Sequence, residues 1–254
     1  MRRGAVGGRP PLLLRPERRT AVLFLSLGRK LVRTMKNKDI FTFRDAEKQA
    51  GPVAFSTMLK PAGSACNLDC GYCYYLDKAA QYGGRQAGMA DDLLELYIRQ
   101  YIEANEVPVV TFCWHGGEPL LLGRDFYRRA VALQRKYAAG KRIENTLQTN
   151  GTLVDEAWCE LFAENGFLVG LSLDGPEDIH DAFRRTKGGR PTFARVMRTV
   201  GMFRRTGVEY NTLSVVNRAC EGRGAEIYRF FRDTVGSRYM QFLPAVEHVV
   251  DRAG

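Results

Sequence analysis

The chain contains 254 residues, of which 45% are hydrophobic and 11% aromatic; this content excludes a disordered chain and allows a sizeable core. The formal net charge is +10, but residues 1–34 hold nine basic side chains against the single acid Glu17 and so carry +8 of it. The other residues share a net charge of +2, which indicates no basic patch and no nucleic-acid partner.

The first 52 residues give the weakest indication of regular secondary structure. Residues 1–34 are rich in Arg, Gly and Pro, and we expect a disordered basic leader there, followed by a lead-in over residues 35–52. The apolar run at 21–27 is too short to span a bilayer and no small-residue cleavage site follows it, so we expect no membrane partner. Met35 opens a more ordinary sequence, and one hypothesis is that the protein starts there in the cell.

From residue 53 onward, short β-rich runs alternate with longer helical patterns, as expected for repeated βα units and a parallel sheet. Six such units favour an α/β fold, a partial (β/α)6 parallel barrel over residues 53–247, with a doubly wound open sheet as the alternative. The predicted strands cover residues 53–60, 109–114, 143–148, 167–173, 209–216 and 238–243. The predicted helices cover residues 91–105, 126–138, 192–205 and 225–235, with one more between Asp155 and Gly166.

Three cysteines, Cys66, Cys70 and Cys73, follow the first predicted strand in the pattern C-x3-C-x2-C. Their thiolates can hold three irons of a [4Fe–4S] cluster and leave the fourth iron open to a ligand. The alternative is a set of free or zinc-binding cysteines, although zinc sites usually close with four ligands. The remaining cysteines are isolated, which indicates buried thiols in a reducing compartment such as the cytoplasm: Cys113, Cys159 and Cys220.

Polar or glycine-rich motifs follow the predicted strands. In a parallel barrel such motifs all lie on the face where ligands bind. After the second strand, Gly116 and Gly117 would let a ligand approach the backbone closely, and the carboxylate of Glu118 would suit a free α-amino group. Taken alone, these residues also fit a tight turn.

The motifs form an ordered set along the chain. They are M-L-K-P at 58–61, C-Y-Y at 73–75, W-H-G-G-E-P-L at 114–120, L-Q-T-N-G-T-L at 147–153, V-G-L-S-L-D-G-P at 169–176 and Q-F-L-P at 241–244. The cysteine loop followed by G-G-E-P resembles the radical S-adenosylmethionine (SAM) enzymes. The whole set, over about residues 55–247, is similar to the anaerobic sulfatase-maturing enzymes among them.

The resemblance implies that the open iron binds the amino and carboxylate groups of S-adenosylmethionine (AdoMet), and that an electron from the cluster cleaves AdoMet to a 5′-deoxyadenosyl radical. This radical would take a hydrogen from Cβ of a cysteine or serine in a partner sulfatase, which becomes formylglycine. A cellular electron donor such as flavodoxin or ferredoxin is a second implied partner. Another peptide-modifying radical enzyme, for instance one that forms thioethers, and a non-catalytic zinc-binding module are the alternatives.

The functional residues of the family can be carried over to matching positions. Some of these residues could instead have a structural role, and Arg184 in particular could form a surface ion pair with Asp178 or Asp181. The residues implied by the resemblance are Cys66, Cys70 and Cys73 for the cluster, Tyr72 and Val246 for the adenine, Gly117 for the methionine part, and Ser172 and Arg184 for the ribose and carboxylate.

Further polar residues lie on the same predicted face. Gln148 and Asn150 point to one side of their strand by alternation, and with His115 they are candidates for contacts with the substrate peptide. Asp174 lies in Asp-Gly-Pro, where an aspartate is expected to stabilise a turn rather than to act as a base.

The resemblance also implies a cysteine-rich C-terminal domain with two further clusters and the aspartate that accepts the substrate proton. No cysteine follows Cys220. We therefore expect residues 248–254 to be a truncated tail and the proton acceptor to lie beyond Gly254. This chain is expected to hold one cluster and to cleave AdoMet without completing the oxidation, an expectation that formylglycine at full yield would contradict.

Overall fold

The computed structural model describes residues 51–52, 54–75, 78 and 88–246. The chain divides into two units, residues 1–51 and 52–254, and the fold described below belongs to the second. The predicted leader, most of the lead-in and the predicted tail at 248–254 lie outside the described residues and stay predictions. Across the residues that are described, no helix combines the length and the apolar character needed to span a membrane.

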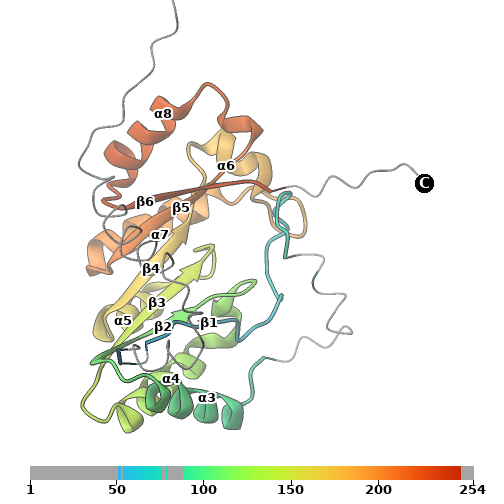
Figure 1. The fold of residues 1–254 in the computed structure, drawn as a ribbon. Coiled ribbons are helices and arrows are strands. Elements are labelled where there is room, and N and C mark those ends of the chain that lie inside the picture. Colours follow the sequence, from blue (N-terminus) through green and yellow to red (C-terminus); the bar gives the residue numbers. More distant parts are fainter. Residues whose placement is uncertain (1–50, 53, 76–77, 79–87, 247–254) are drawn as a thin grey trace, which may run out of the picture. The chain divides into compact units, whose positions relative to one another are not determined.

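Six parallel strands form one sheet, and their order in space is their order in the chain (Figure 1). A doubly wound sheet would reverse its strand order at a switch point, and this sheet does not. The predicted partial (β/α)6 barrel is therefore confirmed and the open-sheet alternative is wrong. The strands are β1 (Met58–Leu59), β2 (Val109–Trp114), β3 (Arg142–Thr149), β4 (Phe167–Ser172), β5 (Tyr210–Val216) and β6 (Met240–Pro244).

Helical segments connect the successive strands. Helices α3 and α4 pack against each other, as do α5 and α7. The α-helices are α3 (Asp91–Ala104), α4 (Gly123–Tyr137), α5 (Glu156–Glu164), α6 (Glu177–Phe183), α7 (Phe193–Thr206) and α8 (Gly224–Arg229). The shorter segments are η2 (Pro119–Leu122), η3 (Arg218–Cys220) and the π-helical η4 (Phe230–Val235).

Three elements differ from the prediction. The strand expected at 53–60 is only Met58–Leu59, because the Phe55 amide donates to the side chain of Asn105 at 3.1 Å instead of to a neighbouring strand. The helix expected at 225–235 changes from α to π at Phe230. Helix α6 was not predicted, since seven residues are too few to show a helical repeat.

The alternation along β2 shows how the core fixes the sheet. Val110, Phe112 and Trp114 are at most 1% exposed and belong to the core shared with the helices. Thr111 and Cys113 are half-buried and face the other side of the sheet. Because a shift of one residue would turn the apolar set away from the helices, this pattern fixes the register. It thereby brings the carboxyl ends of the strands, and the motifs after them, to one edge.

Candidate active site

The cysteine loop follows β1 and lies against the end of β2. The amide of Gly117 donates to the carbonyl of Gly63 at 3.0 Å, and that of Glu118 donates to the carbonyl of Ala65 at 2.7 Å. A Cβ atom on Gly117 would lie 2.1 Å from the Ala65 oxygen, closer than any side chain could tolerate. The glycine is therefore required for the cysteine loop itself to approach β2.

A second set of backbone contacts holds the other end of the loop. Asp69 donates its amide to the carbonyl of Arg185 at 2.8 Å, and Gly71 donates to Phe183 at 3.0 Å. Leu68, which is 1% exposed, forms an antiparallel bridge with Thr186. The loop is thus secured between the end of β2 and the segment after α6, and Figure 1 shows this segment beside the cysteine loop.

The chemistry of the three thiols fits an iron–sulfur cluster. Burial raises the pKa of Cys66, and it raises the pKa of Cys70 to about 12 against the opposing effect of Arg184. Thiolates in this loop therefore need a bound metal centre to compensate their charge. The Cys66 sulfur already lies 3.4 Å from the Leu68 amide and 3.9 Å from Asn150 Nδ2, donors of the kind that stabilise cluster sulfurs.

The spacing of the thiols also bears on the metal. Each of Cys66 and Cys70 is influenced electrostatically by Cys73, so the three lie near one another. Among the described residues, no three Cys, His, Asp or Glu side chains are arranged to share a single metal ion. A cluster takes each thiolate on a different iron, whereas a structural zinc ion takes four ligands on one atom.

A cavity of about 480 Å³ opens beside the cysteine loop. Residues far apart in the sequence line it, because the loop, the residues directly after β2 and parts of β3, β4, β5 and β6 meet there. Gly117 and Asn150 are not among its lining residues. The predicted residues that line it are Tyr72, Cys73, His115, Gln148, Ser172, Arg184 and Val246.

Arg184, which lines the cavity, belongs to a buried ion pair. Arg184 Nη2 donates to Asp174 Oδ1 at 3.0 Å, and Nε lies 3.0 Å from Oδ2 without the alignment of a hydrogen bond. Tyr72 donates its hydroxyl to the same carboxylate, and the Val215 amide donates to it at 2.9 Å. Burial opposes the charge of Arg184, but Asp174 outweighs it and the pKa of Arg184 is raised.

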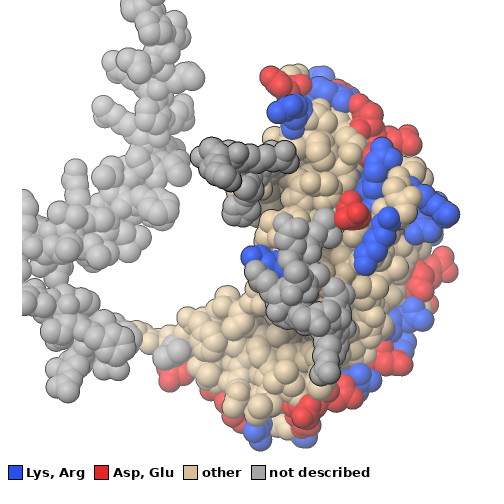
Figure 2. Space-filling view, turned by 90° about the vertical axis from the view of Figure 1, so that its right-hand side faces the viewer, with Lys and Arg blue, Asp and Glu red and all other residues tan. Residues whose placement is uncertain are grey.

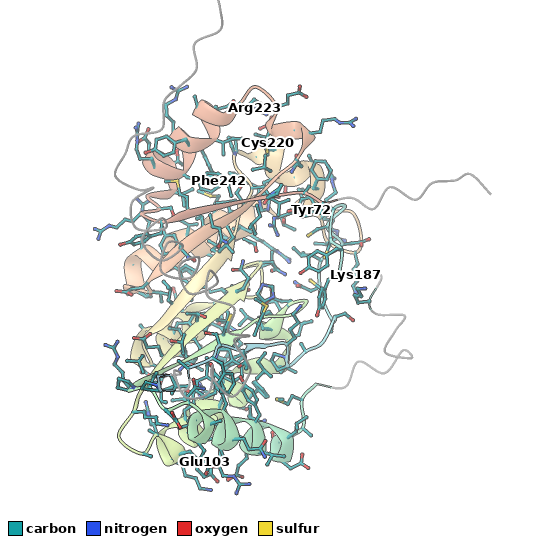
Figure 3. The ribbon with its side chains drawn as sticks, in the orientation of Figure 1. Tyr72, Glu103, Lys187, Cys220, Arg223 and Phe242 are labelled. Carbon is teal, nitrogen blue, oxygen red and sulfur yellow. The ribbon has the colours of Figure 1, made fainter. Side chains whose placement is uncertain are left out.

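These contacts correct two expectations. Arg184 is 7% exposed and pairs with Asp174 rather than with a surface acid, so the alternative of a surface ion pair is wrong. Asp174 is fully buried and joins the cysteine loop, α6 and the end of β5, which goes well beyond stabilising a turn. Figure 3 shows Tyr72 at the edge where the strands end.

His180 supports this ion pair through hydrogen bonds to the Asp174 amide and, by way of Thr192, to the Arg184 carbonyl. Its Nδ1 accepts from the Asp174 amide at 3.4 Å, and its Nε2 lies 3.0 Å from the Thr192 hydroxyl, which donates to the Arg184 carbonyl at 2.7 Å. Because Nδ1 accepts, the proton of the neutral ring is on Nε2. Burial, assisted by Arg184, lowers the pKa of His180 to about 4, and the ring stays uncharged.

Neutral polar groups also line the cavity. Gln148 Nε2 donates to Ser172 Oγ at 2.8 Å. A Cβ on Gly170 would lie 2.3 Å from Gln148 Oε1, so the missing side chain leaves the room that Gln148 occupies. His115 Nδ1 accepts from the Gly116 amide at 2.8 Å, and burial together with Lys60 lowers the pKa of His115. Its Nε2–H is left as a donor.

Two expected ligand groups do not line the cavity. Glu118 is fully buried and accepts hydrogen bonds from Thr149 Oγ1 and the Asn150 amide, both at 2.8 Å, instead of facing a free amino group. Burial raises the pKa of Glu118 to about 7. Asn150 donates to Asn67 Oδ1 at 2.9 Å and so supports the cysteine loop. That contact places it beside the loop rather than at the cavity.

Sequence reasoning missed His180 and Gly170, and it gave Asp174 too small a role. Asp174 was visible as a carboxylate directly after a strand. His180 and Gly170 gave no signal of their own, because one acts through a hydrogen bond to a backbone amide and the other through the side chain that it lacks.

The fold and the loop together define a class of protein. A parallel sheet with strands in consecutive order, and a three-cysteine loop at the carboxyl end of its first strand, is the arrangement that the motifs predicted. Residues 61–218 match the radical SAM superfamily, and the chain belongs to that superfamily.

Within this class the chain is similar to anaerobic sulfatase-maturating enzymes. It is 46% identical over 194 residues to the serine-type enzyme of Bacteroides thetaiotaomicron, an alignment that covers 76% of this chain and 47% of the relative. It is 37% identical over 201 residues to the cysteine-type enzyme of Clostridium perfringens, with 78% and 54% covered. The chain thus spans about half the length of the curated relatives it matches.

Solved structures show the same likeness. Native anSMEcpe with bound AdoMet and the Kp18Cys peptide has a TM-score of 0.70 at 36% identity, covering 76% of this chain and 51% of that one. Native anSMEcpe with bound AdoMet has a TM-score of 0.69 at 36% identity, with 74% and 51% covered. The resemblance predicted from the motifs is confirmed.

Proposed function

We propose that this chain holds a [4Fe–4S] cluster on Cys66, Cys70 and Cys73, binds AdoMet in the adjoining cavity, and cleaves it to begin the oxidation of a cysteine or serine in a partner sulfatase to formylglycine. The cavity is the observation that supports this most directly. Its volume of about 480 Å³ is typical of a cofactor site, and Cys73 of the cysteine loop forms part of its lining.

The polar walls suit the parts of AdoMet. Arg184 keeps its charge in a buried setting and offers a charge-assisted contact to a carboxylate. Ser172 and Gln148, joined by a hydrogen bond, present a hydroxyl and an amide to the ribose. Tyr72 has its hydroxyl held by Asp174, so its ring stays oriented beside the adenine, and Val246 supplies an apolar contact.

When bound, the cluster and AdoMet supply a carbon radical that can remove hydrogen from an unactivated C–H bond. The chain contributes the binding and the orientation. His115, neutral and with Nε2–H available, can donate to a carbonyl of the substrate peptide. Gly117 leaves the space that the cysteine loop occupies. Any contact that it makes with the methionine part of AdoMet would use its backbone.

Anaerobic reconstitution tests the proposal. The protein is loaded with iron and sulfide, reduced, and given AdoMet with a peptide containing Cys-x-Pro-x-Arg or its serine counterpart. We expect acid-labile sulfide to accompany the bound iron, and 5′-deoxyadenosine to appear by mass spectrometry. The same assay reports formylglycine, whose yield measures how far this chain completes the oxidation.

Two cysteine variants give the matched comparison. Cys70→Ala removes a loop thiol and is expected to abolish both the cluster and 5′-deoxyadenosine. Cys159→Ala removes a fully buried thiol on α5 and is expected to retain both. Zinc in place of iron, or 5′-deoxyadenosine production that survives Cys70→Ala, would contradict the proposal. A thioether product would keep AdoMet cleavage but overturn formylglycine formation.

A further inference from the structure

A short hairpin after α6 presents three basic side chains to solvent. Arg185, Lys187 and Arg190 are all exposed, and we call residues 185–191 the basic hairpin. Its backbone is ordered by hydrogen bonds, with the Thr186 amide donating to the Arg190 carbonyl at 3.0 Å. An antiparallel bridge joins Arg185 to Pro191. The three cations are therefore held on a defined turn.

The charges of the basic hairpin are not neutralised locally. Some exposed cations elsewhere are paired, for example Arg124 with Asp155 at 2.8 Å. Within the described part of the chain, Arg185, Lys187 and Arg190 form no ion pair, and Arg185 donates only to a backbone carbonyl. On the face shown in Figure 2, Lys and Arg side chains are interspersed with Asp and Glu, and Figure 3 shows Lys187 at the outer edge beside the cysteine loop.

The basic hairpin is bonded to the part of the cysteine loop that contains Cys70. The amides of Asp69 and Gly71, on either side of Cys70, donate to the backbone of residues 183–185. The cavity lining includes Cys73, but it includes neither Cys70 nor any residue of the basic hairpin. A protein seated on the hairpin would therefore lie close to the cluster ligands and leave the cavity lining uncovered.

We propose that the basic hairpin is the docking surface for an acidic one-electron carrier protein that reduces the cluster from the Cys70 side. The inference rests on the proposed function. In this step the carrier is oxidised by one electron and the cluster is reduced by one electron, and no proton or group is transferred. A substrate peptide has to reach the cavity, which the hairpin does not line, so the positions of these charges favour an electron carrier.

Charge steering gives the expected size of the effect. Complementary charge raises association rates by about 10-fold to 1,000-fold and is screened as salt rises. A triple variant, Arg185→Gln with Lys187→Gln and Arg190→Gln, should slow cluster reduction by a reduced flavodoxin at least about tenfold at low salt. Its affinity for oxidised flavodoxin, measured by fluorescence anisotropy, should fall in parallel. The wild-type rate should decrease steeply with salt and the variant rate only weakly.

A matched control removes the same charge elsewhere. Arg99→Gln with Arg198→Gln and Arg229→Gln changes three exposed cations on α3, α7 and α8 and should leave the flavodoxin rate and affinity unchanged. Photoreduced deazaflavin, a small reductant, should reduce the cluster equally in all three proteins. If both triple variants lose flavodoxin affinity equally, or the hairpin variant loses none, the inference is overturned.

The controls separate the two proposals. If deazaflavin reduces the wild-type cluster but AdoMet is not cleaved, the proposed function fails while flavodoxin affinity still tests the docking surface. A hairpin variant that reduces normally with flavodoxin but binds the substrate peptide poorly would assign the basic hairpin to the sulfatase and overturn the electron-carrier inference.

Discussion

A single buried residue, Asp174, holds together several groups at the cavity. Its carboxylate accepts from Tyr72, Arg184 and the Val215 amide, so three elements depend on one buried charge. Removing that charge leaves Arg184 buried without its partner. Breaking a buried pair in this way typically costs about 3–5 kcal/mol. We expect Asp174→Asn to lower the free energy of unfolding by about that amount in urea titrations.

An exposed ion pair offers the control for Asp174. Asp178 pairs with Arg223 on the surface, and Asp178→Asn should change the unfolding free energy much less, because water screens that pair. Only the Asp174 variant should also weaken AdoMet binding, measured by calorimetry on the reconstituted protein. Equal losses of stability in the two variants would show that the buried network adds nothing.

His180 gives this network a defined pH dependence. Its pKa is about 4 in the folded chain and about 6.5 when unfolded, so the unfolded chain binds the proton first as the pH falls. The stabilisation is fully present above pH 6.5 and is lost as the pH falls toward 4, by at most about 3 kcal/mol.

The variant His180→Gln isolates that contribution. We expect the difference in unfolding free energy between wild type and variant to shrink between pH 6.5 and pH 4. Glu118, whose pKa is raised to about 7, titrates in an overlapping range with the opposite sign, but it is present in both proteins and cancels from the difference. A difference that stays constant with pH would contradict the neutral, hydrogen-bonded state of His180.

At the scale of elements, the contact between the cysteine loop and β2 depends on Gly117. A methyl group there would push the Ala65 carbonyl away, and with it the loop. We expect Gly117→Ala to bind less than half as much iron and sulfide as wild type after reconstitution. Gly224→Ala is the control, since a Cβ there meets nothing within 4 Å. Wild-type iron content in both variants would show that the loop can move without losing its metal.

The strand-end motifs show what the sequence could predict about the site. The cysteine loop and the polar residues at the cavity follow from residue type and position, since each stands just after a strand. The outcome for Glu118 could not be predicted in this way. Whether a carboxylate after Gly-Gly faces a ligand or the interior depends on the donors that β3 brings to it, here Thr149 and Asn150. Such partners come from tertiary structure and leave no local pattern.

At the scale of the whole molecule, regular repetition made the fold predictable. Five of the six strands are close to their expected ranges, because short β-rich runs alternate regularly with helical patterns along the chain. The first strand was too long in the prediction, since an amide bonded to the Asn105 side chain cannot be recognised from sequence. The basic hairpin shows the same limit, because only the fold places residues 185–191 beside residues 66–73.

The backbone partners of the cysteine loop have a consequence for synthesis on the ribosome. The partners that join the loop to β2 and to the segment after α6, residues 117–118 and 183–186, are translated after the cysteines. The nascent chain therefore exposes three thiols before the structure that positions them exists, and the sheet must reach at least β4 and α6 before the loop can close. Iron delivered earlier would meet a flexible thiol segment, so productive cluster insertion belongs after most of the sheet has been made.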